Sequence, residues 1–379
     1  MIGRLSPPPA IVRCLWVGPD LTRVGGAASH LRQVLLHTAT PHLGFATFGN
    51  AVEPALAVRL SATLPLAHRR WVSYPRSIML LKRFLDRHRP LAMLAFGPQP
   101  LIVAGAAAAL AERSPSLGYV EITRPLRAGE VGGGVVAKHI NAVMFRRALG
   151  QVRIAAANSN DGLAELATLV DPRGRELRTV RNPIDLEAWR LPTAEIAPGR
   201  PLRLLSVGRL VSSKGFADLL QAAASLARRF PLRLAIAGAG PELPVLQRQS
   251  VQLGLGDRVS FLGCLEDPRD AMRDADVFVF PSRYEGFPNA VLEAMAAGRP
   301  VVSSLWGSDA RGLQDAGVLR GYEPGDVAGL TAALGAVLES PAVREDLAIR
   351  GRRHVARFAA SEVAADYDAL FRDLIESAA

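Results

Sequence analysis

Short apolar runs alternate with helical stretches along the first half of the chain, and turn residues separate them. The apolar runs, which we expect to be strands, are Ile11–Gly18, Leu91–Gly97, Gly118–Thr123, Val152–Ala157 and Leu177–Arg181. One helical stretch begins at Ala27, and two others cover Ser77–His88 and Leu101–Glu112. This alternation is typical of parallel βαβ units with helices on both faces of a sheet.

The alternation stops at residues 189–200 and then starts again. The segment contains Pro192, Pro198 and Gly199 and has little periodicity, so we expect a linker. The strands expected beyond it are Leu202–Val207, Leu234–Ala237, Val259–Leu262, Val277–Phe280 and Val301–Ser303. The helices expected beyond it begin near Gly215, Glu242, Pro268, Asn289 and Asp326.

The two runs of alternation predict an α/β protein of two doubly wound, Rossmann-like domains that face each other across a cleft. We expect a first domain at residues 1–188, a linker at 189–200 and a second domain at 201–360. The last segment, residues 361–379, has a helical pattern over Ser361–Ile375 and is expected to pack back on the first domain.

The composition is that of a folded globular protein. Of 379 residues, 49% are hydrophobic and 21% are charged, which excludes a mostly disordered chain. Two cysteines are too few for a disulfide framework, and none of the seven histidines lies in a ligand-spaced pair with carboxylates, so we expect no metal site. The most apolar stretch, Leu91–Leu110, is broken by Pro98 and Pro100, and residues 1–10 have no apolar signal core. We therefore expect a cytoplasmic protein.

The positive charge is concentrated in the first half. The chain has 45 basic and 35 acidic residues, of which residues 1–199 hold 24 basic and 13 acidic ones, leaving 21 and 22 for the second half. An anionic partner of the first domain is therefore expected. The helical stretch Ser77–His88 has basic side chains and follows Trp71 and Tyr74, which suits an anionic membrane surface but also an ordinary sheet-covering helix. We find no recognised nucleic-acid-binding signature and expect no nucleic-acid partner.

Two segments carry candidate chemistry. The first, Ser206–Phe216, is a strand end, a loop with Arg209 and Lys214, and the start of a helix. Two cations beside a helix N-terminus form an anion site, because the free backbone N–H groups and the helix dipole add to the side-chain charge. The alternative is a strand–helix turn with two solvated cations.

The second segment, Phe280–Gly298, contains two glutamates. Glu285 directly follows a strand, and Glu293 lies on the apolar side of a helix that begins near Asn289. A carboxylate there could accept two hydrogen bonds from a ribose diol, whereas the alternative for Glu293 is a solvated surface position. The first backbone N–H groups of the helix, at Asn289, Ala290 and Val291, are expected to be free to hold a diphosphate.

Together the two segments resemble the retaining glycosyltransferase family four, which has the GT-B fold. The family's G-R-L-x-x-x-K-G loop corresponds to Gly208–Gly215, and its E-x(7)-E segment corresponds to Glu285 and Glu293. Shorter resemblances lie at Gly25-Gly26, Arg181–Asp185, Ala235–Glu242 and Phe261–Gly263. The segment Ser282–Asn289 is especially similar to members that build bacterial cell-surface polysaccharides and lipopolysaccharides.

The resemblance implies a role for each matching position. Arg209 and Lys214 would bind the donor diphosphate and stabilise the leaving nucleoside diphosphate, and Glu285 would contact the donor sugar. These three residues are the catalytic candidates. The further donor-binding candidates are Gly26, Gly240, Gly263, Gly286, Phe287, Asn289, Ala290, Val291 and Glu293, of which Glu293 would bind the ribose and Gly263 would lie by the base. No divalent metal or other cofactor would be obligatory, because cations and helix N–H groups meet the developing charge.

Two departures from the family pattern concern the acceptor side and the second domain. Many members have a histidine after a first-domain strand, whereas Tyr119–Pro125 has none, which leaves Glu121 and Arg124 as acceptor-side candidates. The segment Trp306–Leu313 differs from the family's usual Gly/Pro/Glu segment.

The sequence thus predicts a retaining glycosyltransferase of polysaccharide or lipopolysaccharide assembly. A UDP-sugar is the favoured donor, and the acceptor is expected to be a glycan or a lipid-linked molecule, with peripheral contact at the inner face of the cytoplasmic membrane. The alternatives are a nucleotide-sugar epimerase or hydrolase of the same fold, and a catalytically silent scaffold. A dinucleotide-binding site at Gly238-Ala-Gly240 is disfavoured, because the third glycine of that fingerprint is missing.

Overall fold

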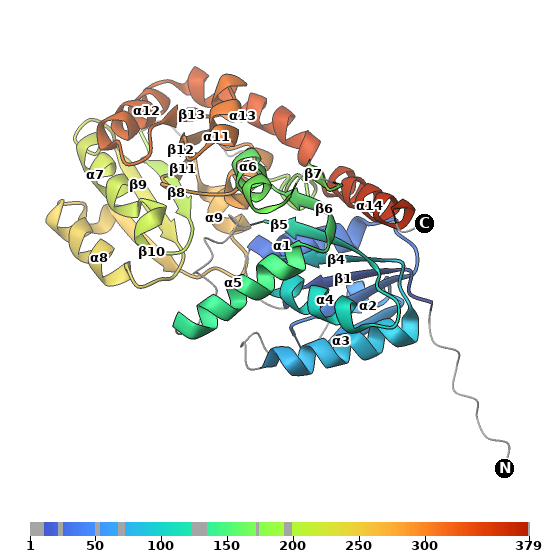
Figure 1. Cartoon of the computed structure of the whole chain (residues 1–379). Coiled ribbons are helices and arrows are strands. Elements are labelled where there is room, and N and C mark those ends of the chain that lie inside the picture. Colours follow the sequence, from blue (N-terminus) through green and yellow to red (C-terminus); the bar gives the residue numbers. More distant parts are fainter. Residues whose placement is uncertain are drawn as a thin grey trace, which may run out of the picture. The chain divides into compact units, whose positions relative to one another are not determined.

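The chain forms two compact units (Figure 1). The computed structural model describes residues 11–21, 26–49, 54–66, 73–122, 135–171, 174–192 and 199–377. Unit 1 comprises Met1–Pro183 and Ala360–Ala379, and unit 2 comprises Ile184–Ala359.

Unit 1 is built on a parallel sheet of seven strands in the order β3-β2-β1-β4-β5-β6-β7. The strands are β1 (Cys14–Gly18), β2 (Leu43–Thr47), β3 (Ala62–Pro65), β4 (Ala92–Phe96), β5 (Ser116–Glu121), β6 (Val152–Ala157) and β7 (Glu176–Thr179). Strands β1, β2 and β4 are buried along their whole length, as expected for strands that helices cover on both faces. The strand order reverses between β1 and β4.

The helices of unit 1 form one layer on each face of this sheet. They are α1 (Gly26–His37), α2 (Pro54–Ala57), α3 (Tyr74–His88), α4 (Pro98–Leu110), α5 (Val135–Leu149), α6 (Asn160–Leu169) and α14 (Ala360–Glu376). Helix α4 packs between α3 and α5, and α14 packs against α1 and on strands β4, β5 and β6 (Figure 1). Pro98 and Pro100, which interrupt the longest apolar run, lie in the first turn of α4, where a missing N–H costs little. No helix in the described ranges is long and apolar enough to cross a bilayer.

Unit 2 repeats the plan with six parallel strands in the order β10-β9-β8-β11-β12-β13. The strands are β8 (Leu202–Val207), β9 (Leu232–Ala237), β10 (Val259–Gly263), β11 (Val277–Phe280), β12 (Val301–Ser304) and β13 (Arg320–Tyr322). The helices are α7 (Phe216–Leu226), α8 (Leu243–Gln252), α9 (Arg269–Asp274), α10 (Asn289–Ala296), α11 (Ser308–Asp315), α12 (Val327–Glu339) and α13 (Pro341–Val355). The strand order reverses between β8 and β11, and the α/β prediction of two Rossmann-like folds is confirmed.

The chain passes between the units at Pro183, earlier than the expected end of the first domain at residue 188. Ile184 belongs to unit 2, where its N–H donates to the Phe358 carbonyl (2.8 Å) and the residue pairs with Ala359. The chain enters unit 2 at Ile184 and leaves it at Ala359, and these two residues are held together by backbone pairing.

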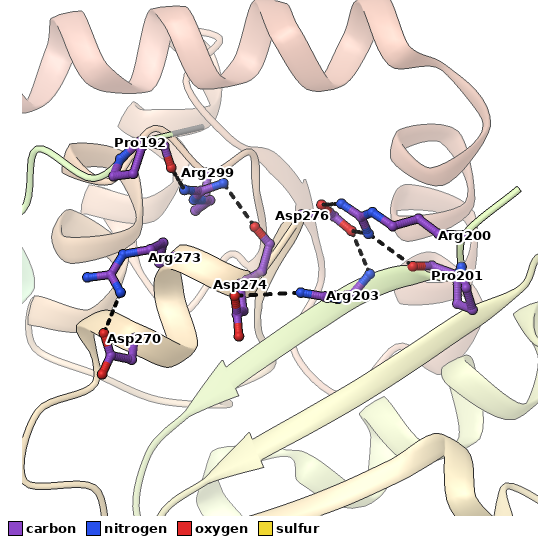
Figure 2. Close-up of polar contacts among 10 residues, drawn as sticks. Pro192, Arg200, Pro201, Arg203, Asp270, Arg273, Asp274, Asp276 and Arg299 are labelled. Carbon is purple, nitrogen blue, oxygen red and sulfur yellow. Dashed lines mark hydrogen bonds and ion pairs between the residues drawn. The ribbon is translucent and has the colours of Figure 1, made fainter. Parts of the chain in front are cut away.

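The described ends of segment 189–200, which we expected to be a linker, are anchored to unit 2. Trp189 lies in the unit 2 core, and the Pro192 carbonyl accepts a hydrogen bond from the buried Arg299 guanidinium (2.7 Å). Figure 2 shows Arg200 on both carboxylate oxygens of Asp276, at 2.6 and 2.7 Å. The anchors lie at the start of β8 and β11, at the opposite ends of these strands from the loops described below.

Helix α14 is joined to α1 by two sets of polar contacts. The Tyr367 hydroxyl lies 2.8 Å from Nε2 of the buried His30, whose Nδ1 lies 3.1 Å from the Asn182 Oδ1. Because that amide oxygen only accepts, Nδ1 donates to it and Nε2 accepts from Tyr367. The next residue, Asp368, accepts hydrogen bonds from the hydroxyls of Thr38 and Thr40 and from the backbone beyond the end of α1. The last helix is thus an integral part of unit 1.

Helix α3, which we considered for an anionic membrane surface or as a sheet-covering helix, covers the sheet with its apolar side. Leu81, Phe84 and Leu85 are buried in a core cluster of unit 1, and so is Tyr74. This apolar face is therefore used inside the protein, and the outer side of α3 exposes Arg76, Arg83 and Arg87 together with Met79. Trp71 lies outside the described residues.

Candidate active site

The loops that follow β8, β9 and β10 are tied together by their backbones. The N–H of Gly208 donates to the Ala237 carbonyl (3.0 Å), and the N–H of Gly238 donates to the Gly263 carbonyl (2.7 Å). A Cβ on Gly238 would overlap the Gly208 carbonyl oxygen, and one on Gly240 would overlap that of Leu210. These glycines allow the β9 loop to pack on the β8 loop, which explains Gly238-Ala-Gly240 without a dinucleotide.

Lys214 and Glu285 meet at the carboxyl ends of β8 and β11. Lys214 ends a 3₁₀ turn at Ser212–Lys214, and its Nζ forms an ion pair with Oε1 of Glu285. Both side chains are mostly buried, with 17% and 15% of their surface exposed. The same Oε1 accepts a hydrogen bond from Ser282 (2.6 Å), and the Lys214 ammonium lies 5.7 Å from the centre of the Phe280 ring. Two residues that the sequence placed in separate segments are thus one cluster.

A second ion pair locks the same two loops together. Both side-chain oxygens of Asp218, in the first turn of α7, accept from the Arg283 guanidinium, the shortest contact being 2.9 Å. The Arg283 N–H also donates to the Ser213 carbonyl (2.8 Å). Sequence reasoning did not single out Asp218, Ser282 or Arg283. The Ser-Arg pair within the segment before Glu285 was the available signal, but nothing in the sequence pointed to Asp218.

Arg209 differs from Lys214 in having no side-chain partner in the part of the chain that the structure describes. It follows β8 by two residues and is exposed, and its guanidinium makes no hydrogen bond or ion pair among the described residues. At this edge of the sheet it is the cation that remains available to an anion.

Glu293 lies in α10, between Leu292 and Ala294 of the core, and is only partly exposed. Its carboxylate accepts no hydrogen bond from the part of the chain that the structure describes. Burial, with a smaller contribution from the charge of Asp267, raises the pKa of Glu293 to about 7. A half-buried, unpaired carboxylate is costly in a fold that needs only an apolar residue there, so the position has the character of a binding group.

The start of α10 offers fewer free N–H groups than we expected. Asn289 is the first residue of the helix and Ala290 the second, but the N–H of Val291 donates to the Pro288 carbonyl (3.2 Å). A 3₁₀-type bond of this kind is common in the first turn of a helix. The prediction that Val291 presents a free N–H is therefore wrong.

The remaining predicted donor residues of unit 2 also lie at the carboxyl edge of the sheet. Gly263 ends β10 with a φ of 71°, a conformation that favours glycine. Gly286 and Phe287 follow Glu285, and both contact Trp306, which comes just after β12. The candidates that follow β8 and β11 thus lie where the strand order reverses, the position at which open α/β sheets bind ligands, whereas Gly240 follows the neighbouring strand β9 and Gly263 ends β10.

The unit 1 candidates are described on their own. Gly26 is the exposed first residue of α1, whereas its neighbour Gly25 lies outside the described residues. Glu121 ends β5, is fully buried, and accepts a hydrogen bond from the Tyr119 hydroxyl. Burial and the Glu121 charge raise the pKa of Tyr119 well above its usual value. Arg124 lies outside the described residues.

Comparison with known families identifies the second unit. Residues 201–340 match the family model of the glycosyl transferases group 1. We refer to residues 201–340 as the group 1 domain because of this similarity. The match agrees with the resemblance that the two motifs carry, and it covers Arg209, Lys214, Glu285 and Glu293.

Curated relatives of the group 1 domain extend the likeness beyond the family model. The chain is 33% identical over 266 residues to a glycogen synthase of Mycobacterium tuberculosis, covering 67% of this chain and 62% of the synthase. It is 31% identical over 183 residues to the lipopolysaccharide core biosynthesis glycosyltransferase LpsE of Rhizobium meliloti, covering 47% of this chain and 52% of that protein. The chain thus spans less than two thirds of the length of these relatives.

A solved structure shows the fold of the whole chain. The HepE protein of Anabaena, solved in complex with UDP, superposes with a TM-score of 0.77 over 96% of this chain and 100% of its own, at 16% identity. The likeness establishes the GT-B fold class for this protein, with the group 1 domain as its second unit.

Proposed function

We propose that this protein is a retaining glycosyltransferase that moves a sugar from a nucleoside-diphosphate sugar, with UDP-sugar favoured, to a glycan or lipid-linked acceptor. The observation that carries the proposal is the Lys214–Glu285 pair at the carboxyl ends of β8 and β11, between which the strand order reverses. Arg209 and Glu293 lie on the segments that follow these same two strands. The family of residues 201–340 and the UDP complex of HepE support the donor class. The relationship to LpsE supports a role in lipopolysaccharide or polysaccharide assembly.

The charges suit a diphosphate leaving group. Breaking the bond between the sugar and the diphosphate leaves negative charge on the diphosphate, which Arg209 and Lys214 would stabilise where it develops. Lys214 has three donors, so it can keep its contact with Glu285 and still reach a phosphate oxygen. Glu293 would accept hydrogen bonds from the ribose diol, and the Glu285–Phe287 turn would contact the sugar. We propose that no divalent metal is obligatory for this chemistry.

Ligand-dependent thermal stabilisation tests the donor assignment. The wild type is heated with UDP, GDP, ADP, CMP or NAD, and Lys214→Ala serves as the site variant. At about 100 times the dissociation constant, a bound nucleotide should add roughly 2.7 kcal/mol of stability. A shift with one nucleoside diphosphate that is lost in Lys214→Ala supports the proposal. The absence of a shift with every nucleotide would refute it and leave the scaffold alternative.

The products then separate transfer from the other enzymatic alternative. The wild type is incubated with the sugar conjugate of the nucleotide it binds, with and without a lipopolysaccharide or polyprenyl-linked glycan acceptor. A glycosyltransferase should release nucleoside diphosphate faster when acceptor is present and should modify the acceptor. Equal release of free sugar or of an epimerised sugar without acceptor would instead establish the hydrolase or epimerase function.

We also propose that unit 1 contacts an anionic membrane surface, and that α5 provides the contact. Helix α5 exposes Ile140 and Val143, at 41% and 53%, one turn apart. The exposed Lys138, Arg146 and Arg147 flank them, and the helix has no acidic residue. Two aliphatic side chains among cations match the boundary between anionic headgroups and acyl chains.

Vesicle flotation tests this contact. The protein is mixed with phosphatidylglycerol-containing vesicles and with pure phosphatidylcholine vesicles, at low and high salt. Replacing Arg146 and Arg147 together by Glu should abolish binding to the anionic vesicles, whereas the same change at the exposed Arg228 and Arg229 of unit 2 should not. Equal binding to both vesicle types, or equal effects of the two double variants, would refute the assignment to α5.

A further inference from the structure

A buried tryptophan holds the turn that follows Glu285. Trp306 lies two residues after the end of β12 and is only 4% exposed. Its indole Nε1–H donates to the Gly286 carbonyl at 3.2 Å. Gly286 follows Glu285. Trp306 is therefore hydrogen-bonded to the backbone next to Glu285, the residue that we assign to the donor sugar.

The indole ring contacts the chain on both sides of Glu285. Its centre lies 5.6 Å from that of Phe280, with the ring planes at 81°, and 6.4 Å from that of Phe287, at 80°. Phe280 ends β11, whereas Phe287 lies in the turn. Edge-to-face pairs of this kind are favourable, and the indole is rigid. Trp306 therefore fixes the Gly286–Phe287 turn relative to the strand that carries it.

The groups assigned to the phosphates and ribose depend on other contacts. The loop that carries Lys214 is held by the Asp218–Arg283 pair, and Glu293 lies in α10. Loss of the Trp306 hydrogen bond should therefore loosen the sugar-side turn and leave the nucleotide side in place.

We infer that Trp306 is a positioning residue for the sugar end of the donor, acting through the Gly286–Phe287 turn. The inference rests on the proposed function, because it presupposes a nucleoside-diphosphate sugar at this edge of the sheet. It also gives a role to the segment Trp306–Leu313, which departs from the usual family pattern.

The test compares binding of UDP with binding of UDP-glucose by isothermal titration of the full chain. Trp306→Phe keeps an aromatic ring but removes the N–H. The matched control is Trp16→Phe in the core of unit 1, where the indole N–H has no hydrogen-bond partner in the described structure. Losing one hydrogen bond should raise the dissociation constant of UDP-glucose about five-fold in Trp306→Phe. The constant for UDP should stay within about two-fold, and Trp16→Phe should change neither.

Two results would overturn the inference while leaving the proposed function intact. A similar loss for UDP and UDP-glucose in a folded Trp306→Phe variant would mean that Trp306 supports the whole site. Unchanged binding of both would mean that the hydrogen bond does not position the turn. GDP and GDP-mannose are titrated alongside, and the same comparison applies if they are the ligands. A wild type that binds neither pair would remove the proposed function and this inference together.

Discussion

Lys214 and Glu285 are 71 residues apart in the sequence and form an ion pair across the carboxyl ends of β8 and β11. Each side chain is mostly buried, so removing one partner leaves the other charge without compensation in a place that water hardly reaches. The pair therefore brings the loops assigned to the phosphate end and to the sugar end of the proposed donor site into contact.

The two partners should have opposite effects on nucleotide affinity. Lys214→Ala removes a charge-assisted contact to the diphosphate and should weaken UDP binding by about 10- to 100-fold. Glu285→Gln removes a negative charge beside the diphosphate, so UDP should bind as well as before or more tightly while sugar transfer falls. Isothermal titration and an acceptor-dependent transfer assay measure the two quantities. A parallel loss of UDP binding in both variants would contradict this division, and Arg228→Ala is the surface control.

The strands of the two sheets differed in how well the sequence predicted them. The strands β6, β8 and β11 have the expected bounds, because their apolar runs are continuous and end at clear turns. We did not predict β2, β3 and β13. Strand β3 is an edge strand with only alternate burial, and β13 is a three-residue strand that begins with an exposed arginine. Their pairing depends on the neighbouring strand more than on their own residues.

The sequence located the candidate site better than it described the contacts within it. The two motifs predict which loops carry the polar groups, because parallel strands bring their carboxyl ends to one edge. Spacing along the chain does not reveal the ion pairs Lys214–Glu285 and Asp218–Arg283. It also does not reveal that the Val291 N–H donates a hydrogen bond to the Pro288 carbonyl. For α3, the basic helical pattern with aromatics nearby fitted both a membrane surface and a sheet-covering helix, and only packing shows that its apolar side faces the core.

Gly240 and Gly312 should respond oppositely to replacement by alanine. A Cβ on Gly240 would overlap the Leu210 carbonyl, so Gly240→Ala must shift the β8 or β9 loop and should cost about 1–3 kcal/mol. Gly312 lies in α11 with open space around it, so Gly312→Ala should stabilise by up to about 1 kcal/mol. The thermal midpoint of unfolding should therefore fall by several degrees in the first variant and rise slightly in the second. Equal midpoints would show that the β9 loop is not packed as described.

Glu293 should link nucleotide binding to pH. Its pKa of about 7 lies above the ordinary value because of burial, and a carboxylate accepts both diol hydrogen bonds only when ionised. UDP affinity should therefore rise as the pH increases from 6 to 8, and Glu293→Gln should bind weakly with little dependence on pH. Titrations at pH 6, 7 and 8 measure this, with Glu242→Gln as the control. A wild-type affinity that is flat over this range would exclude a role for the Glu293 charge.

The same residue should cost stability where its charge is present. A carboxyl whose folded pKa is raised binds more protons when folded, so its destabilising effect grows as the pH rises from about 4.5 to 7 and is complete above 7. Glu293→Gln should then be more stable than the wild type at pH 8, by a few kcal/mol at most because the group is partly solvated. At pH 4 the two proteins should unfold at nearly the same temperature. Lower stability of Glu293→Gln at pH 8 would show that the carboxylate is satisfied within the protein.

His30 should make unit 1 sensitive to acid. Burial lowers the pKa of His30 to about 3, although the hydrogen bond to Asn182 by itself raises it. The unfolded chain therefore binds a proton at this position below about pH 6.5, where the folded chain does not, and stability falls as the pH drops. From pH 6 to 4 this one residue should remove about 1.4 kcal/mol for each pH unit.

Replacing Tyr367, the α14 partner of His30, tests whether acid destabilises α14 through this contact. Tyr367→Phe leaves the buried Nε2 without its hydroxyl and should destabilise unit 1 by about 1–3 kcal/mol at pH 7. His30→Gln should reduce the slope of stability against pH between 6 and 4, whereas His139→Gln, at an exposed position of α5, should leave the slope unchanged. Hydrogen exchange of α14 amides follows the same transition, because α14 packs on α1 and on the sheet through this contact. Protection of α14 that persists at pH 4 while other parts of unit 1 exchange would show that the His30–Tyr367 contact is not what holds the helix in place.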